Sequence, residues 1–266
     1  MVTITNLLQP ATLEEAVQYV QSNPGVPLIA GGTFVLARPD SVTIPVAVDI
    51  SKLLPKQFTA TDSAYHIGSG MTFQELLEQD IPPVLRLALS TMSNRNIRNR
   101  ATIGGNIGAH KSCASLVPLF LVLDAQLKLA HENTLIPLQD WLKNPQGIIL
   151  EVQCARPDGR YMNVTYFRRT SCDLSSIIVA VSYAVHGGKI STLTLALGGF
   201  SKHAELRPDI AACFEGKERP THKKTISAAV QPLLHALEDQ RGSSAYKEYL
   251  GAEKIAEALI GAEVQL

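Results

Sequence analysis

The chain has 266 residues, of which 45% are hydrophobic and 18% charged, and its 24 Lys and Arg residues balance 24 Asp and Glu residues. This composition is typical of a globular protein with room for two domains, each with its own core. The formal net charge of zero argues against a nucleic-acid-binding protein, which normally carries a basic excess on one face.

The sequence shows no pattern of a signal peptide, a membrane span or a cysteine-based metal site. The N-terminal MVTITNLLQP lacks the basic start and the long apolar core of a signal peptide. The longest apolar runs, such as SLVPLFLVLDA from Ser115, are shorter than the roughly 20 residues that span a membrane. The cysteines form no CxxC pair, which argues against a disulfide scaffold, structural zinc and an iron–sulfur cluster. We therefore expect a cytoplasmic protein with no membrane segment and no metal site of its own.

The first predicted elements are a helix and three strands. Thr12 and Glu15 have the spacing of a capping box, and the apolar residues after them recur on one helical face. A strand that runs into Gly31 follows. Further strands are predicted at residues 46–50 and 64–70.

Helices then alternate with one more strand. Thr72 and Glu75 carry the capping signal of a second helix, and Pro82 suits the first turn of a third. Another helix is expected over residues 116–123, and residues 126–130 alternate as a strand does.

A polar stretch at residues 154–161 is the candidate domain boundary. Beyond it, residues 162–167 and 177–185 are rich in strand-forming side chains, and HGGK at 186–189 turns the chain into residues 190–200. This pattern predicts an antiparallel hairpin. From Asp209 onwards the chain is predicted to be mostly helical, with helices at residues 225–238 and 245–260.

Adjacent glycines occur four times. Gly187-Gly188 is interpreted as the hairpin turn, and Gly198-Gly199 as a bulge or tight bend at the end of a strand. The other two pairs differ, because a small or hydroxyl residue flanks each of them. These pairs are Gly31-Gly32, between Ala30 and Thr33, and Gly104-Gly105, between Thr102 and Asn106.

Two readings of these flanked pairs remain open. Glycine lets successive backbone N–H groups converge on an anion and lets the anion approach closely, so two such loops could hold a pyrophosphate. They could equally be two structural turns. The basic cluster Arg95, Arg98 and Arg100 before the second pair is likewise either a solvated surface or an attractor of anions. Dinucleotide, Walker, HExxH and GxSxG patterns are not found.

The two glycine segments carry a family resemblance. LIAGGTFVL (28–36) with IRNRATIGGNIG (97–108) resembles the FAD-binding subunit of molybdenum hydroxylases, the group of xanthine and carbon monoxide dehydrogenases. The likeness continues in RRTSCDLSSIIVAVSYAV, where Arg169 lies four residues before Asp173, and in RGSSAYKEYL (241–250). The resemblance therefore extends over nearly the whole chain.

The resemblance implies that FAD is the cofactor and that both segments contact its pyrophosphate. The chain departs from the family's pattern at two positions. Ser115 stands where the family usually has an aspartate, and Thr165 stands where it often has a lysine. We predict no catalytic residue and no metal ligand. The candidate cofactor-binding residues are Pro27, Leu28, Ile29, Ala30, Gly31, Gly32, Thr33, Phe34, Thr102, Ile103, Gly104, Gly105, Asn106, Ser115 and Thr165.

The family also implies a fold. It is an α+β fold: a two-lobed FAD-binding domain of the PCMH type, followed by a C-terminal domain with an antiparallel sheet and helices. For this chain we expect the FAD-binding domain at residues 1–157. Residues 158–266 are expected to form a C-terminal domain like that of the carbon monoxide dehydrogenase flavoprotein.

The implied function is electron transfer in a heteromeric complex, as the flavoprotein subunit of a xanthine dehydrogenase-like oxidoreductase. A molybdenum cofactor-binding large subunit would hydroxylate the substrate and a [2Fe-2S] small subunit would relay electrons. FAD in this chain would pass them to NAD or another acceptor. One alternative is a non-catalytic assembly subunit whose flavin site has decayed. Another is a free-standing flavin oxidase, for which the sequence reveals no substrate-side acid or base.

Overall fold

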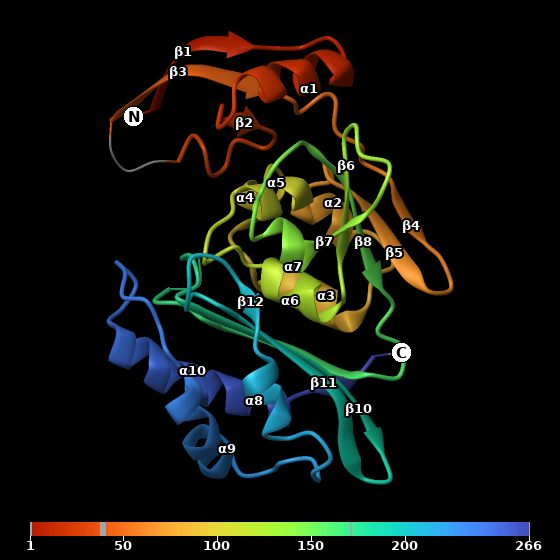
Figure 1. The fold of residues 1–266 in the computed structure, drawn as a ribbon, viewed down its shortest axis with the longest axis vertical. Helices are drawn as coiled ribbons and strands as arrows, with labels where there is room; N and C mark the ends of the chain where they lie inside the picture. The colour runs from red at the N-terminus through yellow and green to blue at the C-terminus, as the bar shows by residue number, and fades with distance from the viewer. Residues whose placement is uncertain (1, 38–40, 171, 266) are drawn as a thin grey trace. The chain divides into compact units, whose positions relative to one another are not determined.

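The computed structural model describes residues 2–37, 41–170 and 172–265 and has an α+β fold (Figure 1). It divides into two compact units, each built from separate stretches of chain. Unit 1 contains Met1–Gln79, Asn94–Ala109 and Gln126–Cys154, and unit 2 contains Asp80–Ser93, His110–Ala125 and Ala155–Leu266. A division into continuous domains at residue 157 stays a prediction.

The first part of unit 1 is a three-stranded parallel sheet in the order β1-β3-β2. Its strands are β1 (Val2–Leu8), β3 (Val42–Asp49) and β2 (Leu28–Ile29), and helix α1 (Leu13–Ser22) follows β1. The Thr12 hydroxyl accepts the Glu15 N–H, which confirms the predicted N-terminus of this helix. Strand β1 was not predicted, because its residues show no strict alternation of apolar and polar side chains.

The second part of unit 1 is a five-stranded sheet in the order β4-β5-β8-β6-β7. Short helices connect its strands, and the predicted capping box at the start of α2 is present, because Thr72 and Glu75 satisfy each other's backbone N–H groups. The strands are β4 (Phe58–Ala60), β5 (Ala64–Gly68), β6 (Gln126–Leu129), β7 (Ile136–Pro137) and β8 (Ile149–Ala155). The helices are α2 (Phe73–Leu77), α4 (Arg95–Arg98), α5 (Ile103–Gly108) and α7 (Leu138–Trp141).

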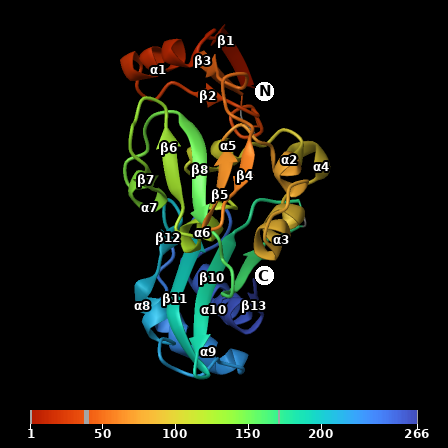
Figure 2. The same cartoon turned by 90° about the vertical axis from the view of Figure 1, so that its right-hand side faces the viewer.

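Unit 2 is built on an antiparallel sheet in the order β12-β11-β10-β9-β13 (Figure 2). The central hairpin turns at Gly187-Gly188, whose φ angles are +56° and +79°, as the sequence predicts. The strands are β9 (Tyr161–Phe167), β10 (Ile177–His186), β11 (Lys189–Gly198), β12 (Glu205–Leu206) and β13 (Glu263–Val264). The helices are α3 (Pro83–Thr91), α6 (Val117–Val122), α8 (Pro208–Ala212), α9 (Lys223–Val230), the 3-10 helix η1 (Gln231–Leu233) and α10 (Ser244–Ile260).

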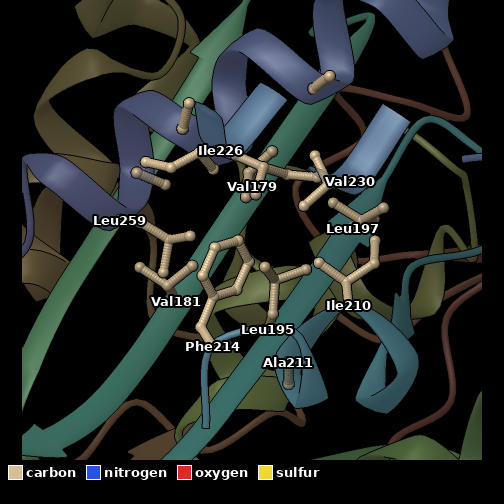
Figure 3. Close-up of a cluster of buried hydrophobic side chains, with 14 of the residues drawn as sticks. Val179, Val181, Leu195, Leu197, Ile210, Ala211, Phe214, Ile226, Val230 and Leu259 are labelled. Carbon is tan, nitrogen blue, oxygen red and sulfur yellow. The ribbon is translucent and has the colours of Figure 1, made fainter. Parts of the chain in front are cut away.

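Apolar side chains from the strands and helices of unit 2 form its core (Figure 3). Alternate residues of β10 and β11 point to one face of the sheet, where they meet residues of α8, α9 and α10. Burying such side chains contributes about 1.5–3 kcal/mol each. Members of this cluster are Val179, Val181, Leu195, Leu197, Ile210, Ile226, Val230 and Leu259.

The fourth glycine pair, Gly198-Gly199, lies where β11 ends. Gly199 follows β11 with a φ of +93°, and a Cβ added there would overlap the carbonyl oxygen of Ser176. The predicted tight bend is therefore confirmed, and the sequence needs glycine there for both conformation and space.

Across residues 2–37, 41–170 and 172–265, no helix is both long and apolar enough to cross a bilayer. The same ranges contain no group of three or more His, Cys, Asp or Glu side chains placed to hold a metal ion.

Candidate functional site

The first glycine segment begins where β2 ends. The Ile29 carbonyl accepts the Ile50 N–H at 2.9 Å, and the chain then leaves the sheet. The N–H groups of the next four residues, Ala30 to Thr33, donate to no acceptor within the described part of the chain. Gly32 has a φ of +73°, and a left-handed residue in such a run can turn successive N–H groups toward one anion. This segment fits the predicted pyrophosphate contact.

Gly31 is required by the protein itself. A Cβ at this position would overlap the carbonyl oxygen of Arg100, so the two backbones approach as closely as they do only because residue 31 has no side chain. The Arg100 side chain returns to the same residue, since its Nε donates to the Gly31 carbonyl at 3.3 Å. The first and second glycine segments are thus brought together by direct contact.

The second glycine segment is not the loop that the sequence suggested. Residues 103–108 form helix α5, and the Thr102 hydroxyl caps it by accepting the Gly105 N–H at 3.1 Å. The N–H groups of this turn are already used within the protein: Ile103 donates to Met71, Gly104 to Ser69, and Asn106 to Thr102. In this conformation the second segment therefore offers an anion a side-chain group, the Thr102 hydroxyl, in place of backbone donors.

Gly104 also has a packing role. A Cβ there would lie 2.7 Å from the Cβ of Ser69, on a strand-like segment that pairs with residues 101–104 through the bridge between Thr72 and Thr102. Valine at position 104 would therefore disturb the fold as well as any ligand. The sequence suggested that these glycines make room for an anion. At Gly31 and Gly104 the missing side chain instead makes room for another part of the chain.

Ser69 is fully buried, and its hydroxyl has no hydrogen-bond partner among the described residues. Burying an unsatisfied hydroxyl costs about 1–3 kcal/mol, so Ser69→Ala should leave the free energy of unfolding unchanged or raise it by about 1 kcal/mol. Urea denaturation measures this. Ser182→Ala is the matched control: that buried hydroxyl accepts from Arg160 Nε at 2.6 Å, so its removal should destabilise the protein. A clear loss of stability in Ser69→Ala would mean that its hydroxyl has a partner.

A pocket of about 160 Å³ lies between the two glycine segments. Its most important feature, which was not predicted from the sequence, is that Lys56 lines it together with Arg100. Lys56 lies between β3 and β4, far in sequence from both segments, and no motif marks it. The lining residues are Ala30, Gly31, Ser51, Leu54, Lys56, Gly70, Thr72, Asn99, Arg100 and Thr102.

Glu75 holds Lys56 beside this pocket. Its Oε1 lies 3.2 Å from Lys56 Nζ, and its Oε2 accepts the Thr72 N–H at 2.7 Å. Burial alone would raise the pKa of Glu75, but the Thr72 N–H and Lys56 outweigh it and hold that pKa below the ordinary value of 4.5. The carboxylate thus stays charged at neutral pH.

The remaining predicted residues lie in different surroundings. Pro27 comes just before β2, while the side chains of Ile29 and Ile103 are buried in the protein. Phe34 is 39% exposed. Leu28 lies in β2 and Gly105 in α5. The assignment of these residues to FAD binding stays a prediction.

Ser115 and Thr165 lie on opposite faces of the unit 2 sheet. The Thr165 hydroxyl donates to the Lys254 carbonyl of α10 at 3.2 Å, whereas the next residue, Tyr166, donates from its hydroxyl to the Ser115 carbonyl at 3.3 Å. Successive strand residues point to opposite faces, which explains the separation. The structure therefore does not bring Ser115 and Thr165 into one site.

Comparison with known proteins gives one family. The family described as "FAD binding domain in molybdopterin dehydrogenase" matches residues 3–153. The chain is 28% identical over 265 residues to the xanthine dehydrogenase FAD-binding subunit of Escherichia coli, with 90% of this chain and 88% of that protein covered. It is 33% identical over 213 residues to the nicotinate dehydrogenase FAD-subunit of Eubacterium barkeri, with coverages of 71% and 72%.

Solved structures share the fold. Carbon monoxide dehydrogenase from Hydrogenophaga pseudoflava contains a chain that matches with a TM-score of 0.86 at 21% identity, with 98% of both chains covered. Quinoline 2-oxidoreductase from Pseudomonas putida contains another, with a TM-score of 0.83 at 20% identity, covering 98% of this chain and 96% of that one.

Proposed function

The chain belongs to the family of FAD-binding domains in molybdopterin dehydrogenases, and from this membership we propose that it carries electrons from an iron–sulfur subunit, through FAD, to NAD or another acceptor. It is the FAD-binding subunit of a molybdenum hydroxylase-type oxidoreductase. Two further relatives are named the medium chain of a glyceraldehyde dehydrogenase and the medium subunit of nicotine 6-hydroxylase. These names support a complex with a molybdenum-binding large subunit and a [2Fe-2S] small subunit.

The residues present fit FAD, and the first glycine segment is the observation that carries the proposal. The N–H groups from Ala30 to Thr33 have no acceptor among the described residues, and four such groups in succession suit the diphosphate of a dinucleotide. The Thr102 hydroxyl keeps its own proton to donate, because its oxygen accepts from Gly105. When bound, FAD exchanges electrons singly or in pairs and so connects an iron–sulfur relay to a two-electron acceptor. The chain itself binds and orients the cofactor.

We expect the protein purified from its host to be yellow and to release FAD, and neither FMN nor riboflavin, on denaturation. The reason is that its unengaged N–H groups and cationic pocket suit a diphosphate, which FMN and riboflavin lack. Chromatography of the released flavin measures this. Colourless protein that also takes up no added FAD would contradict the proposal.

Whether NAD accepts the electrons from FAD can be tested on the same preparation. Anaerobic NADH should bleach the flavin absorption if NAD is the acceptor, because electron transfer between them is reversible. No bleaching of FAD-loaded protein would assign another acceptor. We also propose a cytoplasmic location, which the four cysteines support, since none of them forms a disulfide within the described residues.

An assembly subunit with a decayed flavin site is the second candidate. The internal hydrogen bonds of residues 103–106 and the contact of Thr165 with α10 favour it, because both occupy groups that the family resemblance assigned to FAD. In that case the protein would co-purify with its partner subunits but hold no flavin.

A further inference from the structure

A second pocket of unit 1 lies apart from the two glycine segments. Its volume is about 340 Å³, which is within the range of small-molecule sites and equals about eleven water molecules at roughly 30 Å³ each. A ligand of about ten non-hydrogen atoms would fill it. The pocket shares no lining residue with the one beside Lys56 and Arg100, and none of its residues was assigned to FAD.

The pocket lies where the C-terminal end of α1 meets the turn after β6 and the loop before β8. Val17 of α1 and Ile148 belong to one buried apolar cluster, against which Val20 packs. The Ala130 N–H donates to the Ile148 carbonyl at 2.8 Å and so joins the turn after β6 to the loop before β8. The apolar floor of the pocket is therefore formed by packed elements of the fold.

Two glycines keep this space open. Gly25 has nothing within 4 Å of an added Cβ, while a Cβ at Gly147 would lie 3.3 Å from Leu129 Cδ1 and 3.7 Å from His131 Cε1. The φ angles of the two glycines are +83° and +73°, a conformation that favours glycine over residues with a side chain. The backbone conformation thus leaves two walls of the pocket without side chains.

The charges around the pocket suit a cation. Among the described residues, Glu132 is its only carboxylate, and no lysine or arginine lines it. The last turn of α1, residues 19–22, contains no basic residue, so nothing within the helix offsets the negative end of its dipole. An ammonium group would be attracted to this pocket, whereas a phosphate or carboxylate would be repelled.

Glu132 can pair with such a ligand. Its Oε1 lies 3.9 Å from His131 Nε2, and the side chains of Glu132 and His131 are 39% and 37% exposed. An exposed contact at this distance contributes little, so an ammonium group can replace the imidazole beside the carboxylate at low cost. The apolar floor would bury the rest of the ligand, and this burial would supply most of the affinity.

We propose that this pocket binds a small organic cation, whose ammonium group pairs with Glu132 and whose apolar body lies against Val20 and Ile148. Such a site is additional to the proposed function, since it has no residue in common with the predicted cofactor site. A primary amine on a short aryl-alkyl chain combines both features at about the right size. The probe is therefore 2-phenylethylamine.

Calorimetric titration of the purified full-length protein tests this with matched probes. The amine should bind with a dissociation constant of about 1 mM or below. The alcohol 2-phenylethanol has the same size but no charge and should bind about 5-fold more weakly. Phenylacetate should bind more weakly still, because Glu132 repels it. Protein loaded with FAD and protein freed of flavin should bind the amine equally.

Glu132→Gln removes the charge and keeps the shape of the side chain. It should weaken amine binding about 5-fold and leave alcohol binding unchanged. Glu14→Gln is the matched control, since it removes the same charge from an exposed residue of α1 outside the pocket. Val20→Phe should fill the apolar floor and weaken the binding of both probes by about 10-fold or more. Circular dichroism checks that each variant is folded.

A wild-type protein that binds no amine, or that binds the alcohol as tightly as the amine, would overturn the proposal. The same holds if Glu132→Gln binds the amine as tightly as Glu14→Gln does, or if Val20→Phe leaves amine binding unchanged. Displacement of the amine by FAD would assign the pocket to the cofactor and would also overturn it. The flavin released from the protein tests the FAD proposal separately.

Discussion

Gly31→Ala should destabilise unit 1 by about 3 kcal/mol or more and abolish FAD binding. The added Cβ would overlap the Arg100 carbonyl oxygen, which belongs to the backbone and cannot rotate away. Inserting a methyl group into a packed site costs about 1–3 kcal/mol, and a backbone obstruction places this substitution at the upper end or beyond. Urea denaturation followed by circular dichroism, together with FAD titration, measures both effects.

Gly25→Ala separates this obstruction from ordinary glycine strain. Gly25 has a φ of +83° and nothing within 4 Å of an added Cβ, so its replacement should cost only about 1–2 kcal/mol and leave FAD binding intact. Gly32 has a φ of +73°, and a Cβ added there would lie 3.0 Å from the flexible Leu36 side chain. The loss of stability in Gly32→Ala should therefore fall between the losses in Gly25→Ala and Gly31→Ala. If Gly31→Ala is no less stable than Gly25→Ala, the two segments do not approach as described.

Asp239→Asn should lower the free energy of unfolding by about 3 kcal/mol. Its partner Lys247 is only 1% exposed, with Nζ at 2.8 Å from Asp239 Oδ1, and also donates to the Gly199 and Leu237 carbonyls. Removing the carboxylate charge leaves a buried ammonium uncompensated, which costs more than losing the pair as a whole. Chemical denaturation of the two proteins at neutral pH measures the difference.

Lys247→Met is the matched substitution. It removes the buried charge and keeps the length of the side chain, so its cost should be smaller, about 1–2 kcal/mol from two carbonyls that lose a donor. A larger loss in Lys247→Met than in Asp239→Asn would contradict the view that the uncompensated charge dominates.

The same pair predicts a pH dependence. Burial alone would raise the pKa of Asp239, but hydrogen bonds from Lys247 and the Arg241 N–H outweigh it and lower that pKa from its ordinary value of 3.8. As pH falls through the ordinary value, the unfolded chain takes up the proton first, so this group's stabilisation is complete above that range and is lost below it. The stability of Asp239→Asn should therefore fall less steeply with acid than that of the wild type.

Local features of this protein were determined by the sequence alone. The capping residues Thr12 and Thr72, the hairpin turn at Gly187-Gly188 and the bend at Gly199 depend on hydrogen bonds and φ angles of a few neighbouring residues. Such requirements restrict which amino acids can occupy a position, so they can be recognised without the fold. The family followed from two short segments for the same reason.

Tertiary structure decided how those segments are used. The residues around Gly104 and Gly105 left open whether they form a loop open to an anion or a structural turn. In the fold, Thr102 caps a helix there and the N–H groups face protein acceptors. Whether a glycine's missing side chain makes room for a ligand or for another part of the chain depends on what the fold places against it.

Contacts between distant residues were equally decided by the fold. Ser115 and Thr165 were grouped because both replace a charged residue of the family, but strand alternation separates them across a sheet. Lys56 carries no local signal, and only the path of the chain brings it to a pocket with Arg100. A lysine's charge is the same at every position, so its role follows from the groups that the tertiary structure places within its reach.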